Sequence, residues 1–314
     1  MSKYITKRIL ALIPVLLVVA TVVFILMRLL PGNPAAMMLG PEATPEDIAR
    51  LSQEMGLDQP VIIQMFDWYV NILKGDLGNS IFLRIPVTDA IIMHMEATAL
   101  LTVLSLFMAV VMGITAGVIA ASRHNGIMDQ IVMFTSSLGV AIPNFWLALM
   151  LVLLVALPLS FFPVFGYETV KKVGLLGSLR YLILPAIALA SGQAAIIARM
   201  TRANMLEVLQ NDYIRTARAK GVKGSLVIFK HALKNAIIPT ITVIGLCFAN
   251  LMGGAVVTEQ IFNIPGVGSL LITAVLRRDY PLISGIVIYI AAAYVIINLL
   301  IDILYSYLDP RIKF

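Results

Sequence analysis

The stretch Asp212–Gly224 reads DYIRTARAKGVKG and lies between two of the most apolar parts of the chain. It is rich in Arg and Lys, whereas the segments on either side hold long runs of Ile, Leu, Val and Ala. Cations beside apolar segments are typical of the cytosolic side of a membrane protein, because Lys and Arg near the ends of spans set orientation. The stretch therefore predicts that its flanking segments cross a bilayer.

The composition of the whole chain supports that prediction. The 314 residues are 60% apolar and only 13% charged, with a mean hydropathy of +0.95, whereas soluble domains are about half apolar and a quarter charged. A span needs about 20 helical residues to cross a ~30 Å hydrocarbon layer. Six windows satisfy this requirement: Ile9–Leu30, Ala97–Ala121, Ile131–Leu157, Tyr181–Ala198, Ile237–Val257 and Leu282–Tyr305. The predicted fold is an all-α integral membrane protein with six transmembrane helices.

The spans divide the chain into three parts. Residues 1–30 form an N-terminal cytosolic segment and the first span, residues 31–96 an external helical loop, and residues 97–314 the core with the other spans and a cytosolic loop at about 199–235. With the N-terminus in the cytosol, most of the cations near span ends fall on the cytosolic side, as the positive-inside rule requires. Both termini are therefore predicted to be cytosolic.

The external loop contains signals for helices of its own, and it is too long for a structureless connection. Thr44 is expected to cap a helix, with Asp47 three residues after the cap and Gly56 at the end. A second helix is expected from about Pro60 to Lys74. These residues predict a small helical layer on the external side.

Glycines and prolines mark special positions within the spans. Gly113 and Gly117 have the GxxxG spacing that lets another helix approach closely. Pro143 and Pro185 either kink their spans beside supporting helices or open them toward a pathway.

The cationic loop predicts a corner between two helices. Thr201 is expected to cap the first helix and Gly221 to end it, and Ser225 is expected to cap the second. Along the first helix, apolar positions repeat every four residues at Met205, Leu209, Tyr213 and Ala217. The cations of the loop are Arg199, Arg202, Arg215, Arg218, Lys220, Lys223, Lys230 and Lys234, and only Glu207 and Asp212 oppose them.

Two interpretations of this corner are open. The positive-inside bias and contact with anionic lipids explain the charge. They do not explain the small residues Thr216, Ala217 and Ala219 beside Asp212 and Tyr213, which favour a surface that docks into a protein groove.

The segment TEQIFNIPGVGSLL, Thr258–Leu271, separates spans five and six. Pro265, Gly266 and Gly268 predict a rigid bend followed by a helix start. Together with Glu259 they are the candidate external gate. The alternative is that the segment only connects the two spans.

Several kinds of chemistry are excluded by missing motifs. The chain has no G-x-x-x-x-G-K-[ST] phosphate loop, because GVKGS at Gly221–Ser225 has the wrong spacing. H-E-x-x-H, G-x-S-x-G and Cys/His frameworks are also missing, and the side chains of MHME at Met93–Glu96 do not converge on one ion. We expect no catalytic residue, no metal, no cofactor bound by this chain and no nucleic-acid partner. A self-contained ion-coupled carrier or channel is the competing class, although the spans offer no obvious site for a coupling ion.

Short motifs in a fixed order cover almost the whole chain. They are RLLPGNPA (Arg28–Ala35), MGLDQP (Met55–Pro60), GDLGNS (Gly75–Ser80), IPVTDAI (Ile85–Ile91), MTRANMLEVLQNDYIRTARAKG (Met200–Gly221), HALKNAIIP (His231–Pro239), TEQIFNIPGVG (Thr258–Gly268), RRDYP (Arg277–Pro281) and NLLIDILYSYLDPRI (Asn298–Ile312). In this order they resemble the membrane permease subunit of a binding-protein-dependent ABC importer, in the dipeptide, oligopeptide and nickel branch. The resemblance implies a type I ABC importer permease fold.

The resemblance also implies a role for the corner. In that family a cytosolic loop with the pattern E-A-A-x3-G supplies a coupling helix, which fits a cleft in the ATPase subunit. Alignment on Gly221 places the start of the pattern on Arg215, Thr216 and Ala217, with Arg in place of the usual Glu. The residues expected to couple to the ATPase are Asp212, Tyr213, Arg215, Thr216, Ala217, Arg218, Ala219, Lys220 and Gly221.

The partners and the solute follow from the same resemblance. It implies a second homologous permease subunit, two ATPase subunits that carry ATP and Mg, and an extracytoplasmic solute-binding protein, assembled in the inner membrane of a bacterium. Closure of the ATPases on ATP would push the coupling helices and turn the cavity outward. The expected solutes are small peptides, and nickel, glutathione or another small solute is the alternative.

Overall fold

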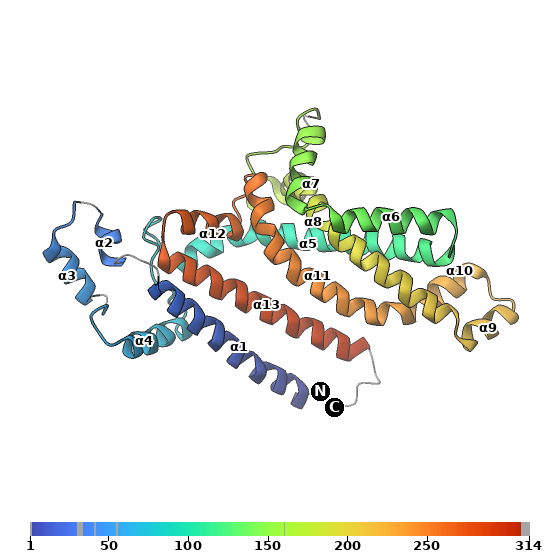
Figure 1. Ribbon diagram of the computed structural model, residues 1–314, viewed down its shortest axis with the longest axis horizontal. Helices are drawn as coiled ribbons and strands as arrows, with labels where there is room; N and C mark the ends of the chain where they lie inside the picture. Colours follow the sequence, from blue (N-terminus) through green and yellow to red (C-terminus); the bar gives the residue numbers. More distant parts are fainter. Residues whose placement is uncertain (1, 30–33, 41, 55, 160, 309–314) are drawn as a thin grey trace. The chain divides into compact units, whose positions relative to one another are not determined.

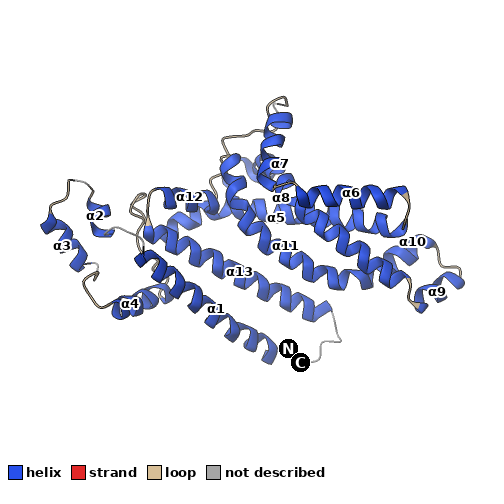
Figure 2. Ribbon diagram, viewed as in Figure 1, coloured by secondary structure: helices blue, strands red, loops and turns tan. Residues whose placement is uncertain are grey.

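The computed structural model describes residues 2–29, 34–40, 42–54, 56–159 and 161–308. Apart from one isolated bridge between Asn79 and Pro86, these residues form helices and the loops that join them (Figure 2). The chain divides into two compact units, Met1–Met95 with Leu270–Val295 and Glu96–Ser269 with Ile296–Phe314. The all-α prediction is confirmed.

The first four helices belong to the first unit: α1 (Ser2–Leu29), α2 (Pro34–Leu39), α3 (Pro45–Glu54) and α4 (Val61–Leu73). The predicted cap of α3 is present, because the Asp47 N–H donates to Thr44 Oγ1 at 3.2 Å and Thr44 Oγ1 donates to Asp47 Oδ2 at 2.6 Å. Both helices predicted in the external loop therefore exist. The last residue of the first predicted span, Leu30, lies outside the described residues.

The remaining helices follow in chain order (Figure 1). They are α5 (Val87–Ser122), α6 (Ile127–Ala141), α7 (Asn144–Leu151) with the π-helical turn η1 (Val152–Ala156), α8 (Val170–Leu209), α9 (Asp212–Ala219), α10 (Gly224–Leu226) with the π-helical turn η2 (Val227–Ala232), α11 (Leu233–Ile261), α12 (Val267–Leu276) and α13 (Tyr280–Leu308).

The lengths and composition of these helices are compatible with six spans. Four stretches are each long and apolar enough to cross a membrane: Val87–Ser122, Val170–Leu209, Gly224–Ile261 and Tyr280–Ile301. The helix α6 and the α7–η1 segment are bent by 99° and pass the same test only as a pair, which is the pattern of a broken span or of a re-entrant loop. The described apolar part of α1, Ile13–Leu29, is shorter than these. The bend falls at Pro143, as predicted, whereas α8 stays helical through Pro185.

Helix α8 is the centre of the second unit, where it packs against α6, α7 and α11. Its contact with α5 uses the predicted GxxxG motif. A Cβ on Gly113 would lie 2.7 Å from the Ile197 Cβ, and a Cβ on Gly117 would lie 2.6 Å from the Thr201 Cβ. Only glycine allows backbones to approach so closely.

This packing corrects the prediction that Thr201 caps a helix. Thr201 is 1% exposed and lies inside α8, which continues to Leu209 because its buried face is held against α5. Ser225 is not a cap either. It lies within α10, which is preceded by Lys223 and has no side-chain cap bond.

Candidate coupling and gate sites

The corner predicted from the cationic loop is the short helix α9. It begins after Asn211, whose backbone is extended, and the helix ends at Gly221 with φ +78°. The Gly221 N–H donates to the Arg218 carbonyl at 3.0 Å and the Val222 N–H to the Ala217 carbonyl at 3.2 Å. This pair of bonds is a Schellman motif, in which glycine takes the left-handed position at no steric cost. The predicted end at Gly221 is therefore confirmed.

A single apolar side chain anchors α9 to the second unit. Ile214 is fully buried, whereas its neighbours Tyr213 and Arg215 are exposed. The cluster around it comes from α5, α8 and the segment that leads into α11: Val118, Ala121, Met205, Val227, Ala232 and Ala236. Burial of one Ile side chain is worth about 1.5–3 kcal/mol, so this contact holds the helix against the ends of longer ones.

Polar contacts fix the same helix from a second side. The Asn235 carboxamide donates to Tyr213 Oη at 2.9 Å and to the His231 carbonyl at 3.0 Å. Within α9, Thr216 Oγ1 donates to the Asp212 carbonyl at 3.0 Å. The phenol of Tyr213 is thus tied to the start of α11, while the rest of its ring faces outward.

All nine predicted coupling residues lie on α9 or in its C-terminal turn. Ala217 is half-buried and the other eight are exposed, so the guanidinium and ammonium groups of Arg215, Arg218 and Lys220 point away from the cluster around Ile214. Sequence reasoning missed Ile214. The predicted four-residue repeat runs through Tyr213 and Ala217 because it takes the segment as one continuous helix. The helix breaks at Gln210–Asn211 and restarts in a new register.

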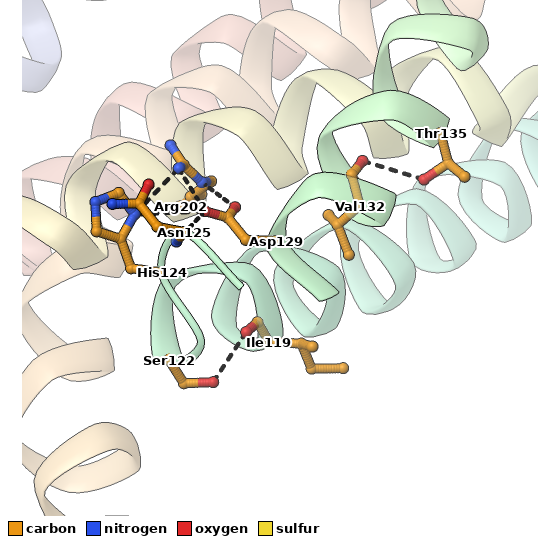
Figure 3. Close-up of polar contacts among 8 residues, drawn as sticks. All are labelled: Ile119, Ser122, His124, Asn125, Asp129, Val132, Thr135 and Arg202. Atoms are coloured by element: carbon orange, nitrogen blue, oxygen red, sulfur yellow. Dashed lines mark hydrogen bonds and ion pairs between the residues drawn. The ribbon is translucent and has the colours of Figure 1, made fainter. Parts of the chain in front are cut away.

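An ion pair between the buried Asp129 and the partly exposed Arg202 ties α6 to the part of α8 that precedes α9 (Figure 3). Arg202 donates from Nε to Asp129 Oδ1 at 2.5 Å and from Nη2 to Asp129 Oδ2 at 2.7 Å. The Asn125 N–H donates to the same carboxylate at 2.9 Å, and His124 Nδ1 lies 3.4 Å from it. Asp129 is 3% exposed, and a two-pronged guanidinium pair of this kind is both strong and directional. In the sequence, nothing sets Arg202 apart from the other cations of the loop.

The candidate gate is organised around a buried carboxylate. Glu259 is 0% exposed at the end of α11. Its Oε1 accepts from Thr98 Oγ1 at 2.6 Å and its Oε2 from the Ser269 N–H at 2.8 Å. Thr98 in turn accepts from the Val267 N–H at 2.8 Å. Buried carboxylates need such donors, because an unpaired one is costly in an apolar interior.

The glycines of the gate segment are required by that carboxylate. A Cβ on Gly266 would overlap the carboxyl group of Glu259. A Cβ on Gly268 would lie 2.9 Å from Glu259 Oε2 and 2.6 Å from the Val256 Cα. Pro265 is exposed at the tip of the bend, and α12 begins at Val267. The predicted bend and helix start are confirmed. Thr98 was missed because it lies 161 residues from Glu259 in the chain.

A second carboxylate orders the start of α8. Glu96 Oε1 accepts from the Val170 N–H at 2.8 Å and from the Tyr167 phenol at 3.2 Å. Burial, together with the charge of Glu96 and the hydrogen bond to it, raises the pKa of Tyr167 to about 12. Within the described part of the chain, no three His, Cys, Asp or Glu side chains are grouped as they would be in a metal site.

The comparisons with known proteins agree with this arrangement. Residues 113–314 match the family described as binding-protein-dependent transport system inner membrane component, and residues 1–82 match the corresponding N-terminal family. The chain is 45% identical to a putative peptide transport system permease protein of Brucella abortus, over 100% of both chains. It is 42% identical to a dipeptide transport system permease protein of Alkalihalophilus pseudofirmus and to a glutathione transport system permease protein of Pectobacterium atrosepticum, again over 100% of both chains.

A solved structure shows the same fold. The crystal structure of an amino acid ABC transporter with histidines aligns with 72% of this chain and 95% of its own chain, with a TM-score of 0.50 and 17% identity. The chain belongs to the family of inner membrane permease components of binding-protein-dependent ABC importers. It is a multi-pass membrane protein and a transport subunit rather than an enzyme.

Proposed function

We propose that this permease passes small peptides from an extracytoplasmic binding protein to the cytosol. The support is the full-length identity of 40–45% to relatives named for peptide, dipeptide and oligopeptide transport. Glutathione is itself a small peptide, so the relative named for it falls within the same solute class. In this proposal the binding protein selects the peptide, and the permease offers it a path.

The main support for a coupling role is that the two faces of α9 differ. One face is anchored by Ile214 and by the Tyr213–Asn235 bond, and the opposite face is exposed and cationic. A lipid contact needs the charge but not the anchoring. A helix that must transmit force needs a rigid attachment to the spans, because small movements at one site are amplified only through packed elements. The residues from Asp212 to Gly221 therefore form the surface on which an ATPase subunit pushes.

The assembly follows from that role. A second homologous permease completes the pathway, and two ATPase subunits bind ATP and Mg and each grip one coupling helix. The N- and C-termini and α9 then lie on the cytosolic side, and the gate segment lies on the outer side. Residues 31–96 form the external layer on which the binding protein docks, and residues 97–314 form the core.

We further propose that Pro265, Gly266 and Gly268 form an external gate whose position is set by Glu259. The carboxylate fastens the bend to Thr98 at the start of the second span, so the bend moves with that span. Loss of the hydrogen bonds that join Glu259, Thr98 and the bend would leave the outer end of the pathway open between turnovers.

The coupling role is tested at Gly221, where a Cβ would meet nothing within 4 Å. Asn and Asp both tolerate the left-handed conformation better than other residues and have the same shape. Gly221→Asp adds an anion to the cationic surface and Gly221→Asn does not, so the pair separates charge from backbone. In the complete complex, we expect G221D to assemble normally but to lose most of its solute-stimulated ATP turnover, while G221N retains it. Equal turnover in G221D, G221N and the unmutated complex would contradict the docking role.

The solute class is tested separately with the purified binding protein. Di- and tripeptides, glutathione and a nickel chelate compete for it, and we expect peptides to bind and the nickel chelate not to. Preferential binding of the chelate would reassign the importer to metal uptake.

A further inference from the structure

Three uncharged carboxamides lie near one level of the membrane domain without hydrogen-bond partners among the described residues. Asn144 starts α7 directly after the 99° bend, Gln193 belongs to α8 and Asn250 belongs to α11. Gln193 is 8% exposed, and its Oε1 has no partner. The structure gives the side chains of Asn144 and Asn250 no hydrogen bond to any described residue. Such groups are costly in hydrocarbon, where nothing replaces the bonds that they lose.

The position of Asn144 follows from the glycines around it. Its Oδ1 lies 3.5 Å from the place that a Cβ on Gly192 would take, and its Nδ2 lies 3.8 Å from the corresponding place on Gly254. Gly192 belongs to α8 and Gly254 to α11, so the corner of the broken span reaches both helices. Irregular backbone at membrane depth is found where it is buried in protein or lines a water-filled cavity.

The register of α8 and α11 brings the other two carboxamides to the same region. The helices are antiparallel, because Leu189 lies 3.4 Å from the Cβ position of Gly254 and the Asn204 carboxamide donates to Thr240 Oγ1 at 3.2 Å. These two pairings place Gln193 level with Asn250, about one helical turn from the Gly254 level where Asn144 lies.

Space is available beside Asn250. Gly253 is exposed, lies one turn further along the same side of α11, and has nothing within 4 Å of the position of a Cβ. An exposed Asn next to an open glycine, in the middle of an apolar helix, indicates a surface that meets water or a polar solute rather than lipid.

We infer that Asn144, Gln193 and Asn250 form a hydrogen-bonding band that contacts the backbone of the passing peptide. This inference rests on the proposed peptide function and names its contact residues in the spans. Each carboxamide both donates and accepts, which matches the N–H and C=O of a peptide group. The windows that contain these residues hold no charged side chain, so the band does not distinguish one peptide side chain from another by charge.

The experiment uses the complete complex in proteoliposomes with saturating binding protein. The cargoes are a tripeptide and the same tripeptide methylated at one of its two internal backbone nitrogens, a pair chosen for equal affinity to the binding protein. The variants Asn250→Leu and Gln193→Met keep side-chain size but remove the polar groups. Ser137→Ala is the control, because its hydroxyl donates only to the Met133 carbonyl of its own helix.

We expect the unmutated complex to import the methylated peptide about two- to tenfold more slowly, the range for one lost hydrogen bond. The double variant N250L/Q193M should lower import of the parent peptide by at least a similar factor and remove most of the difference between the two cargoes, whereas S137A should change neither. Gly253→Leu should assemble and block import of both cargoes by filling the open space.

Other outcomes would overturn the inference. If the variants slow both cargoes equally and keep the difference between them, the carboxamides do not contact the peptide backbone. If N250L separates the two permeases on size-exclusion chromatography, Asn250 is an interhelical contact instead. If the unmutated complex imports both cargoes equally, the carboxamides do not bind the peptide backbone, but the proposed peptide transport is still supported. If it imports neither while its binding protein is loaded, the proposed peptide function itself falls.

Discussion

Replacement of Ile214 by Ala tests whether α9 is held rigidly, as a force-transmitting helix must be. Ile214 is fully buried in a cluster from three elements, and an Ile→Ala change in such a site costs about 2–5 kcal/mol. Because α9 has only eight residues, this loss falls on the local attachment of the helix and leaves the spans in place. A change of 1.4 kcal/mol is a factor of ten in an equilibrium constant. We therefore expect the backbone amides of α9 to exchange at least about 25-fold faster in I214A than in the unmutated complex.

The assay is hydrogen exchange of the assembled complex, read by mass spectrometry on peptides that cover residues 210–223. Ile214→Val is the matched control, because it costs about 0.5–1.5 kcal/mol and should raise exchange only slightly. Solute-stimulated ATP turnover should fall in the same order, with I214A far below I214V. Unchanged protection of α9 in I214A would show that Ile214 is not the anchor, and fast exchange with full coupling would show that rigidity is not needed.

Three further predictions concern the Asp129–Arg202 pair, the contact of Gly266 with Glu259, and Tyr167. Arg202→Ala leaves the buried carboxylate of Asp129 without its two-pronged partner. We therefore expect the free energy of unfolding to fall by about 1.5–3 kcal/mol, the range for hydrogen bonds to charged groups, with a lower melting temperature in detergent. Asp129→Asn with Arg202→Gln should recover part of that loss, and equal melting temperatures of all variants would refute the pairing. Gly266→Ala forces a methyl group into the Glu259 carboxylate, so it should raise ATP turnover without solute. Ser137→Ala, whose hydroxyl donates only within its own helix, should leave that turnover unchanged, and equal turnover in the two variants would exclude the gate. The pKa of Tyr167 is raised to about 12. Its contribution to the free energy of unfolding is therefore complete below the ordinary phenol pKa of about 10 and is lost as the pH rises toward 12. Tyr167→Phe should remove this part of the alkaline unfolding transition.

The sequence predicted those features whose cause is local. Pro143 breaks a helix because proline has no backbone N–H to donate. Thr44 caps a helix because its hydroxyl accepts a hydrogen bond from a backbone N–H, and Gly221 ends one because glycine takes the left-handed conformation. The apolar windows predicted the spans because length and hydropathy are enough to place a helix in a bilayer. The nine residues predicted to couple to the ATPase were chosen by their order along the chain, and all lie on α9 or its C-terminal turn.

The features that sequence reasoning missed depend on contacts between distant residues. Thr201 has the chemistry of a cap, but packing against Gly117 keeps it inside α8. Ile214 is buried because α9 restarts after a break in the helix. The spacing of apolar residues along the sequence does not show the register in which it restarts. The fastening of Glu259 to Thr98 and the pair between Asp129 and Arg202 each join elements that only the fold brings together.

The measurement that tests the central claim most directly is photo-crosslinking from the exposed end of α9. Cys247 is the single cysteine and is buried, so Cys247→Ala gives a background in which Ala219→Cys carries the only label. A benzophenone at residue 219 of the assembled complex should join this chain to an ATPase subunit, while the same label at the exposed residue Leu154 should not. Cross-links from residue 219 to lipid alone would contradict the claim that α9 is the surface gripped by the ATPase.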